Sequence, residues 1–214
     1  MKASRFLVMS FASIWRASSL KALGLLILAP VVLSASDHSQ SFPETSTRNW
    51  DFSVWAAGAT GEENTNRLSE SQILLAGVFV GRATGEIGRG WRRGRFEYGV
   101  DFIPLFVQFT PQRISGTAFD PIILRWNSTQ HRGHVSPFVE LGGGAVHTSA
   151  NLPAGDSSTF NFIARGGGGV LISTRQNHAL ELACRWWHIS NANLGRRNPE
   201  FNGIQVSLGW HWFK

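Results

Sequence analysis

The stretch FEYGVDFIPLF, residues 96–106, indicates the fold class of this 214-residue chain. In an extended strand successive side chains point to opposite faces, so every second residue lies on the same face. One face of this stretch gathers aromatic and aliphatic side chains, namely Phe96, Tyr98, Val100, Phe102 and Phe106. The other face gathers charged residues and glycine, namely Arg95, Glu97, Gly99 and Asp101. The pattern predicts a β-strand whose two faces meet different surroundings.

The same alternation recurs along the chain, and after residue 45 no helical period of 3.6 residues interrupts it. Turn-rich stretches separate the alternating segments, among them TGEENTNR (60–67), TPQRISG (110–116) and the basic, glycine-broken GRGWRRGR (88–95). We expect strands over residues 49–60, 70–83, 94–109, 119–128, 134–148, 159–173, 178–191 and 202–213.

Two architectures would use such strands in opposite ways. A soluble β-sandwich buries the apolar face and shows the charges to water, whereas a membrane β-barrel turns the apolar face to lipid and pairs the charges inside. The strands are long enough to cross a bilayer at a tilt. The chain also ends in LGWHWFK (208–214), which resembles the aromatic final strand of bacterial outer-membrane proteins. These features favour the barrel.

We therefore expect an all-β protein, an eight-stranded antiparallel transmembrane β-barrel in the bacterial outer membrane. Charges on the lipid face would cost several kcal/mol at mid-depth, roughly 2–4 for a basic residue. Seven charged residues are accordingly expected to point inward and to pair: Glu97, Asp101, Arg125, Glu140, Arg165, Glu181 and Arg185.

The N-terminus has the order of a secretory signal peptide. Basic residues precede an apolar run over residues 22–33, which contains Pro30 and is too short to span a bilayer as a helix. The small residues SAS (34–36) follow. We expect residues 1–35 to be removed, with cleavage after Ser34 or Ser36, and residues 36–214 to form one barrel domain. Met9 is an alternative start.

Removal of that segment changes the charge of the chain. The full chain has a formal net charge of +6, and the segment carries four basic residues and no acidic one, so about +2 remains. The basic balance is thus weak support for a nucleic-acid partner, and we expect none. Cys184 is the only cysteine, which excludes an intrachain disulfide.

Two glycine runs, LGGGAVH (141–147) and RGGGGVLIS (165–173), lie inside alternating segments and lack the Gly-Lys-Ser/Thr that follows in a phosphate loop. We expect them to admit an aromatic side chain from a neighbouring strand or to ease curvature. His131 and His134 have no acid or cysteine nearby, so we expect a solvated turn and no metal or cofactor. His147 lies at the end of the fifth segment, where it could approach a site.

The stretch RWWHISNAN (185–193) holds the candidate chemistry. His188 and Ser190 are two residues apart, so they share a strand face, and that face is the apolar one. If the first strand starts in the periplasm, the seventh ends outside, near the lipid headgroups. A polar pair exposed to lipid is costly unless it acts there. The alternative is an interfacial girdle, in which both residues merely sit at headgroup depth.

This region resembles the outer-membrane lipid A 3-O-deacylases, eight-stranded barrels that hydrolyse the ester-linked acyl chain at position 3 of lipid A. The likeness spans residues 185–213: a His-x-Ser-Asn run, an Asn-Pro turn, and a final strand with Leu-Gly-aromatic. Residues 50–184 match only in general barrel character.

The resemblance implies a role for each matching residue. His188 would be the general base, Ser190 the nucleophile, and Asn191 a donor to the oxyanion. The family orients its histidine with a glutamate near the start of the last strand, but residues 202–213 contain no acid. Glu200 is the nearest candidate and Asn202 a neutral substitute.

The surroundings of the pair point to the substrate. Trp186 would pack beside the acyl chain, and Arg196 and Arg197 in the following loop suit the phosphates of lipid A. The function expected is a carboxylic ester hydrolase acting on lipopolysaccharide. Two alternatives stay open: a non-enzymatic structural or adhesion barrel, although its outer loops look short, and a barrel phospholipase, although no acidic cluster for calcium is visible. A homodimer is also left open.

Overall fold

A computed structural model describes residues 49–63, 71–129, 134–153 and 157–214. The expected signal peptide and His131 lie outside the described residues. The strands are β1 (Trp50–Glu63), β2 (Ser71–Ile87), β3 (Gly94–Thr110), β4 (Ile114–Ser128), β5 (Val135–Thr148), β6 (Phe160–Arg175), β7 (His178–Ser190) and β8 (Phe201–Phe213). A short 3-10 helix, η2 (Gly90–Arg92), makes the basic 88–95 stretch a turn between β2 and β3, as predicted.

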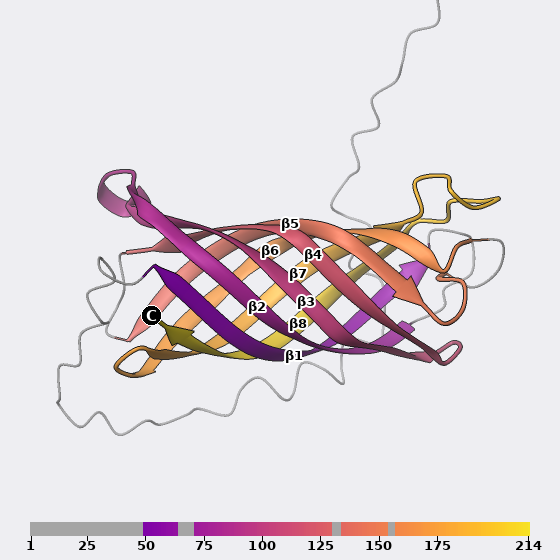
Figure 1. Cartoon of the computed structure of the whole chain (residues 1–214), viewed down its shortest axis with the longest axis horizontal. Helices are drawn as coiled ribbons and strands as arrows, with labels where there is room; N and C mark the ends of the chain where they lie inside the picture. Colours follow the sequence, from indigo (N-terminus) through magenta and orange to yellow (C-terminus); the bar gives the residue numbers. More distant parts are fainter. Residues whose placement is uncertain (1–48, 64–70, 130–133, 154–156) are drawn as a thin grey trace, which may run out of the picture. The chain divides into compact units, whose positions relative to one another are not determined.

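The eight strands form a closed antiparallel barrel in which each pairs with its sequence neighbours and β1 pairs with β8 (Figure 1). Closure leaves no sheet edge unpaired, which is the condition for β-structure in lipid. The predicted fold class is therefore confirmed. In the part of the chain that is described, no helix is long and apolar enough to cross a membrane.

The predicted inward charges are all buried in the barrel interior, and they pair. Arg125 contacts Glu140 at 2.7 Å and Glu181 at 3.1 Å. Arg185 binds the same two carboxylates, at 2.9 Å for Glu181. Three further residues join these interior networks without having been predicted as members: Asp51, Asp120 and His211. Pairing offsets the cost of placing ions away from water.

The remaining pairs lie on the same inner surface. Arg165 contacts Asp101 at 2.8 Å, and Glu97 accepts a hydrogen bond of 2.8 Å from the amide of Asn127. The Glu97 contact joins the neighbouring strands β3 and β4, whereas the ion pair between Arg165 on β6 and Asp101 on β3 crosses the barrel interior.

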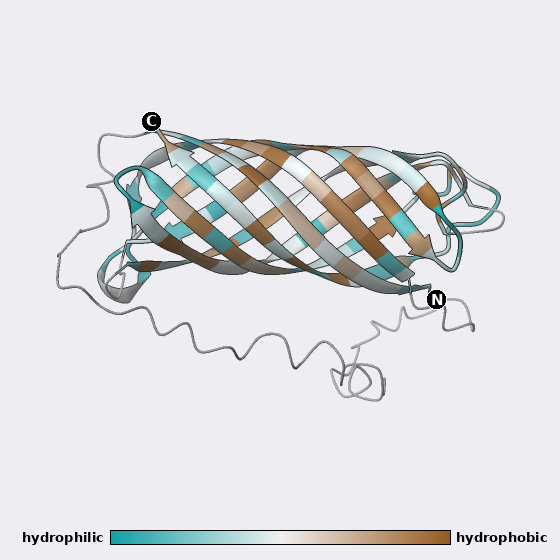
Figure 2. Cartoon of the chain, turned by 90° about the horizontal axis from the view of Figure 1, so that it is seen from below, coloured by the Kyte–Doolittle hydropathy of each residue, from teal (hydrophilic) through white to brown (hydrophobic). Residues whose placement is uncertain are grey.

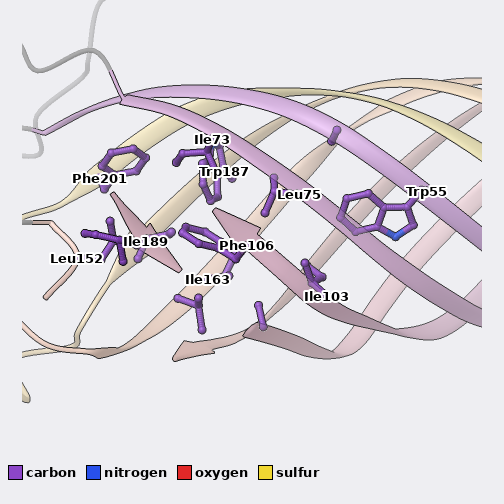
Figure 3. Packing of buried hydrophobic residues seen from close by; sticks show 14 of the residues in the cluster. Trp55, Ile73, Leu75, Ile103, Phe106, Leu152, Ile163, Trp187, Ile189 and Phe201 are labelled. Atoms are coloured by element: carbon purple, nitrogen blue, oxygen red, sulfur yellow. The ribbon is translucent and has the colours of Figure 1, made fainter. Parts of the chain in front are cut away.

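An apolar cluster fills the barrel at the end where β7 stops and β8 starts (Figure 3). The ring of Trp187 packs edge-on against Phe201, with ring centroids 5.6 Å apart, and lies 6.2 Å from Phe106. Leu152, from the segment after β5, is fully buried in the same cluster. Side chains therefore occupy the interior at this end, and they support the wall that holds the candidate site.

The outer surface of the barrel carries large exposed apolar side chains on all eight strands, among them Val54, Val78, Phe102, Leu124, Leu141, Phe162, Leu182 and Leu208. Hydrophobic and hydrophilic residues alternate along the strands, and hydrophilic ones collect in the end loops (Figure 2). An apolar exterior around a charged interior is the inverse of a soluble protein and suits a lipid surrounding.

One residue of the opening stretch lies on the wrong face for our prediction. Phe106 was expected beside Phe102 on the lipid side, but it is fully buried in the interior. The pairing of β3 with β4 shifts register between Ile103 and Phe106, so Pro104 and Leu105 both face outward and the alternation restarts one residue later. A β-bulge of this kind adds an unpaired residue and switches faces.

Several strand ends also differ from the prediction, since β1 runs to Glu63 and so includes Glu62 from the expected TGEENTNR turn. β2 continues to Ile87 rather than ending at 83, and β4 starts at Ile114 within the expected TPQRISG loop. Ile114 is fully buried and Gly116 continues its inward face, where an added Cβ would lie 2.4 Å from the carbonyl of His147. Short polar residues made this segment look like a loop, although they fit the crowded barrel wall.

The glycine runs ease close approach of backbones. A Cβ at Gly144 would lie 2.0 Å from the carbonyl oxygen of Phe119, and one at Gly167 would lie 2.2 Å from that of Cys184. Of the two roles expected for these runs, the contacts favour tight curvature over room for a neighbouring aromatic ring.

Candidate active site

The alternation of side chains at the end of β7 decides which face of the barrel wall the candidate pair occupies. Trp187 and Ile189 are buried inside the barrel, whereas Trp186, His188 and Ser190 point outward. His188 and Ser190 are each half-buried, and Trp186 is 47% exposed. The pair thus lies on the lipid-facing surface at the end of β7, as the alternation predicted.

Two contacts hold the imidazole of His188. Its Nδ1 lies 2.9 Å from Oδ1 of Asn202, the residue opposite it in register on β8. Its ring stacks on Trp186, with centroids 6.0 Å apart and an interplanar angle of 23°. An amide oxygen can only accept a hydrogen bond, so this contact has Nδ1 as the donor, and in the neutral imidazole Nε2 then keeps a lone pair. This is the tautomer that a general base needs.

Ser190 lies at the end of β7, next to an aromatic patch on β6. It is opposite Phe162 in register, and the ring of Phe162 meets that of Phe160 edge-on at 5.5 Å. Among the described residues, no hydrogen bond joins the Ser190 hydroxyl to His188. Two residues along a strand is about 6.6 Å between Cα atoms, so the two groups come into contact only by rotation of side chains toward each other. Catalytic hydrogen bonds are often loose without substrate.

Glu200 and Asn202, the two candidates for orienting His188, are placed differently. Glu200 is exposed in the loop just before β8. Asn202 is inside β8 and makes the contact with Nδ1. The reason is register, since β8 pairs with β7 so that His188 faces Asn202 directly. Of the two candidates, the neutral substitute Asn202 is therefore the one that contacts His188.

Asn191 organises the loop after β7. It is 1% exposed and follows the inward parity of Ile189, away from the face of Ser190. Its side-chain nitrogen donates to the carbonyl of Arg197 at 2.7 Å, and its side-chain oxygen accepts from the amide of Asn193 at 2.9 Å. Its own amide donates to Asn198 at 2.8 Å. These bonds leave the side chain of Asn191 tied to the loop.

The backbone of this loop offers another donor. Ala192 and Asn193 have positive φ angles of 50° and 65°, which turns the chain sharply after Ser190. The amides of Asn191, Asn193 and Leu194 donate within the loop. Among the four consecutive residues 191–194, Ala192 is the one whose amide has no acceptor among the described residues.

Arg196, Arg197 and His147 lie at the same end of the barrel as this centre, whereas His134 lies at the opposite end. Arg196 and Arg197 are exposed in the same loop. His147 points outward near the end of β5, opposite Phe160 on β6, and so lies two strands from β7. His134 is exposed in the turn before β5. No cluster of three metal-ligating side chains occurs among the described residues.

One polar residue near the site was not predicted. Glu62 points outward near the end of β1, and β1 pairs with β8 so that Glu62 lies opposite Asn202. In the sequence, the only signal for Glu62 is that it has the same parity as the lipid-facing residues of β1. Its position opposite Asn202 could not be predicted, because it depends on the pairing of β1 with β8 that closes the barrel.

The closed barrel, its apolar exterior and the polar pair at one rim define a β-barrel of the bacterial outer membrane. A sequence profile of the family described as lipid A 3-O-deacylase (PagL) matches residues 97–211, which is more than half of the chain. The chain belongs to this family.

Two solved structures are similar in fold. The outer membrane enzyme PagL is 17% identical with a TM-score of 0.54, and the match covers 72% of this chain and 97% of that one. Neisserial surface protein A is 12% identical with a TM-score of 0.54, covering 76% and 96%. At these identities the likeness concerns the fold alone. No curated protein sequence matches the chain significantly.

Proposed function

We propose that this protein is a serine esterase that hydrolyses the ester-linked acyl chain at position 3 of lipid A in the outer leaflet. The observation that supports it most is the contact of His188 Nδ1 with Asn202, because in the neutral imidazole it makes Nε2 the acceptor on the same lipid-facing surface as Ser190. Membership of the lipid A 3-O-deacylase family supports lipid A as the substrate class.

The reaction has two halves. His188 Nε2 takes the proton from the Ser190 hydroxyl as its oxygen attacks the ester carbonyl, and the tetrahedral intermediate then expels the sugar oxygen, which takes the proton back from His188. Water, deprotonated by His188, attacks the resulting acyl-serine and releases the fatty acid and free Ser190. Lipid A thus loses one acyl chain and gains one hydroxyl group.

The developing oxyanion needs a fixed donor. We assign this role to the amide of Ala192, because the side chain of Asn191 is bonded within the loop and faces the interior. Asn191 then supports the donor indirectly, since its contacts with Arg197 and Asn198 hold the turn that presents Ala192.

The substrate would lie along the outer wall of the barrel. The acyl chain stays in the membrane beside Trp186 and Phe162, which are exposed on β7 and β6. The phosphates lie above, within reach of Arg196 and Arg197 in the loop. Guanidinium groups bind phosphate through paired hydrogen bonds, which suits headgroup binding rather than chemistry.

Mass spectrometry of lipid A tests the proposed function. Lipid A from cells that express the chain should lack one 3-linked acyl group relative to cells without it, whereas expression of the Ser190→Ala variant should leave lipid A intact. Equal lipid A in all three would instead favour a non-enzymatic barrel, and loss of phospholipid acyl chains would favour a phospholipase.

A further inference from the structure

An acidic residue, Glu62, lies opposite Asn202, the residue that contacts His188. Asn202 lies between two strands: His188 faces it from β7, and Glu62 faces it from β1. All three side chains point outward from the barrel. Directly opposed residues of neighbouring antiparallel strands have Cβ atoms about 4.5–5.5 Å apart. Glu62, Asn202 and His188 therefore form one row across the seam where the barrel closes.

The side-chain amide of Asn202 has an acceptor oxygen and a donor nitrogen. Its oxygen is taken by Nδ1 of His188 at 2.9 Å. Its nitrogen carries two hydrogens that need an acceptor. A glutamate side chain opposite can reach an amide nitrogen from this Cβ separation, and a carboxylate is the stronger kind of acceptor because the bond is charge-assisted.

The position of Glu62 is costly without such a role. The outward residues of β1 before it are uncharged: Trp50, Phe52, Val54, Ala56, Gly58 and Thr60. An ionised group on this surface needs a partner or the headgroup region. The anionic phosphates of lipid A would repel it there, so a hydrogen-bonded partner on the protein is the better explanation of an acid at this point.

We propose that Glu62 is a positioning residue of the esterase site: its carboxylate accepts from the amide of Asn202, whose oxygen holds His188 in the tautomer that serves Ser190. This inference rests on the proposed function. It explains how a chain with asparagine at the orienting position keeps a negative charge behind its histidine, with the charge moved one strand further around the barrel. The charge stabilises the imidazolium that forms when His188 takes the serine proton.

The test compares purified wild type with Glu62→Gln, using lipopolysaccharide in detergent and measuring kcat and KM separately. We expect kcat to fall roughly five- to tenfold with KM unchanged, the size of one lost charge-assisted hydrogen bond acting through a neighbour. Glu86→Gln is the matched control. Glu86 is a partly exposed acid on β2 that pairs with Arg93 at 2.6 Å and is remote from the site, so its loss should leave kcat at the wild-type value.

Rescue separates positioning from folding. The double variant Glu62→Gln with Asn202→Glu puts a carboxylate directly opposite His188, and it should return kcat to the wild-type range. Wild-type kcat in Glu62→Gln, or a loss that the double variant does not repair, would overturn the role of Glu62, as would a selective loss in Glu200→Gln. If wild type releases no more fatty acid than Ser190→Ala, the proposed esterase function itself has failed.

Discussion

The two ends of β7 each present a histidine beside a tryptophan on the outer surface of the barrel. At one end the ring of His178 lies tilted against Trp210, with centroids 5.8 Å apart and an interplanar angle of 38°. At the other end His188 stacks on Trp186, with centroids 6.0 Å apart and an interplanar angle of 23°. Both histidines are half-buried and share the same strand face. A histidine next to an aromatic ring at a membrane boundary is therefore not by itself a sign of chemistry.

The partners of Nδ1 distinguish the two ends. His178 Nδ1 lies 3.0 Å from the backbone oxygen of Gln176, two residues away in its own turn. His188 Nδ1 instead contacts the side chain of Asn202 across β8, and a serine follows on its own face. The first contact is local and only closes a turn. The second comes from another strand, and Asn202 itself lies opposite Glu62 in register, so the contact needs the folded barrel.

The largest expected effect separates the two histidines. His188→Asn removes the general base and should lower kcat for lipid A roughly 10³-fold, the usual size of this contribution. His178→Asn should leave kcat within about twofold of wild type, because its contacts lie at the far end of the strand. Heat-modified migration on gels checks that both variants form barrels. An equal loss of kcat in His188→Asn and His178→Asn would mean that His188 and Ser190 are only residues of an interfacial girdle.

The orienting amide should give the next effect. Asn202→Ala leaves Nδ1 without its partner, so the imidazole loses its fixed tautomer, and kcat should fall roughly ten- to 100-fold. Asn202→Asp retains an acceptor and should stay nearer to wild type. Single-turnover release of fatty acid would measure the chemical step directly, and equal rates in wild type and Asn202→Ala would remove the amide from the mechanism.

The loop arginines should affect binding more than chemistry. Replacing Arg196 and Arg197 with glutamine should raise KM for lipopolysaccharide roughly tenfold, since each phosphate contact is charge-assisted and partly screened by solvent. Turnover of a small soluble ester should stay unchanged. A parallel loss on both substrates would mean that the arginines shape the catalytic loop.

The smallest expected effect concerns the two tryptophans that contact these histidines. Trp186→Ala removes an aromatic contact from His188 and apolar area from the acyl chain, and should lower kcat/KM roughly threefold to tenfold. Trp210→Ala removes the equivalent ring from His178 and should not change kcat/KM. The ratio of the two variants, measured on the same lipopolysaccharide, isolates the contribution of the outer stack.

Much of the fold could be predicted from parity alone. Alternation placed Glu97, Arg125 and Glu181 inside the barrel, because the side-chain period of a strand is fixed. It failed at Phe106, since a bulge in β3 shifts the faces by one residue. Pro104 marks this bulge in the sequence, because a strand that pairs on both sides admits proline at bulges. It also missed the start of β4, where Ser115 and Gly116 resemble a loop.

The candidate site divides in the same way. His188 and Ser190 are neighbours in sequence, so their shared face could be predicted from their spacing. The orienting contact depends on which residue lies opposite His188 in the pairing of β7 with β8. The register of these two strands decides between Glu200 in the loop and Asn202 in β8, and the sequence does not show it. Glu62 is more distant still, because its place opposite Asn202 exists only once β1 and β8 close the barrel.

The most direct measurement is release of fatty acid from purified lipopolysaccharide by the Ser190→Ala barrel beside the wild type, with lipid A followed by mass spectrometry. Our account predicts that the wild type removes the 3-linked acyl chain and that Ser190→Ala, folded to the same extent, removes none above the uncatalysed background. Unchanged deacylation by a folded Ser190→Ala barrel would contradict the account, and His188 and Ser190 would then be girdle residues like His178.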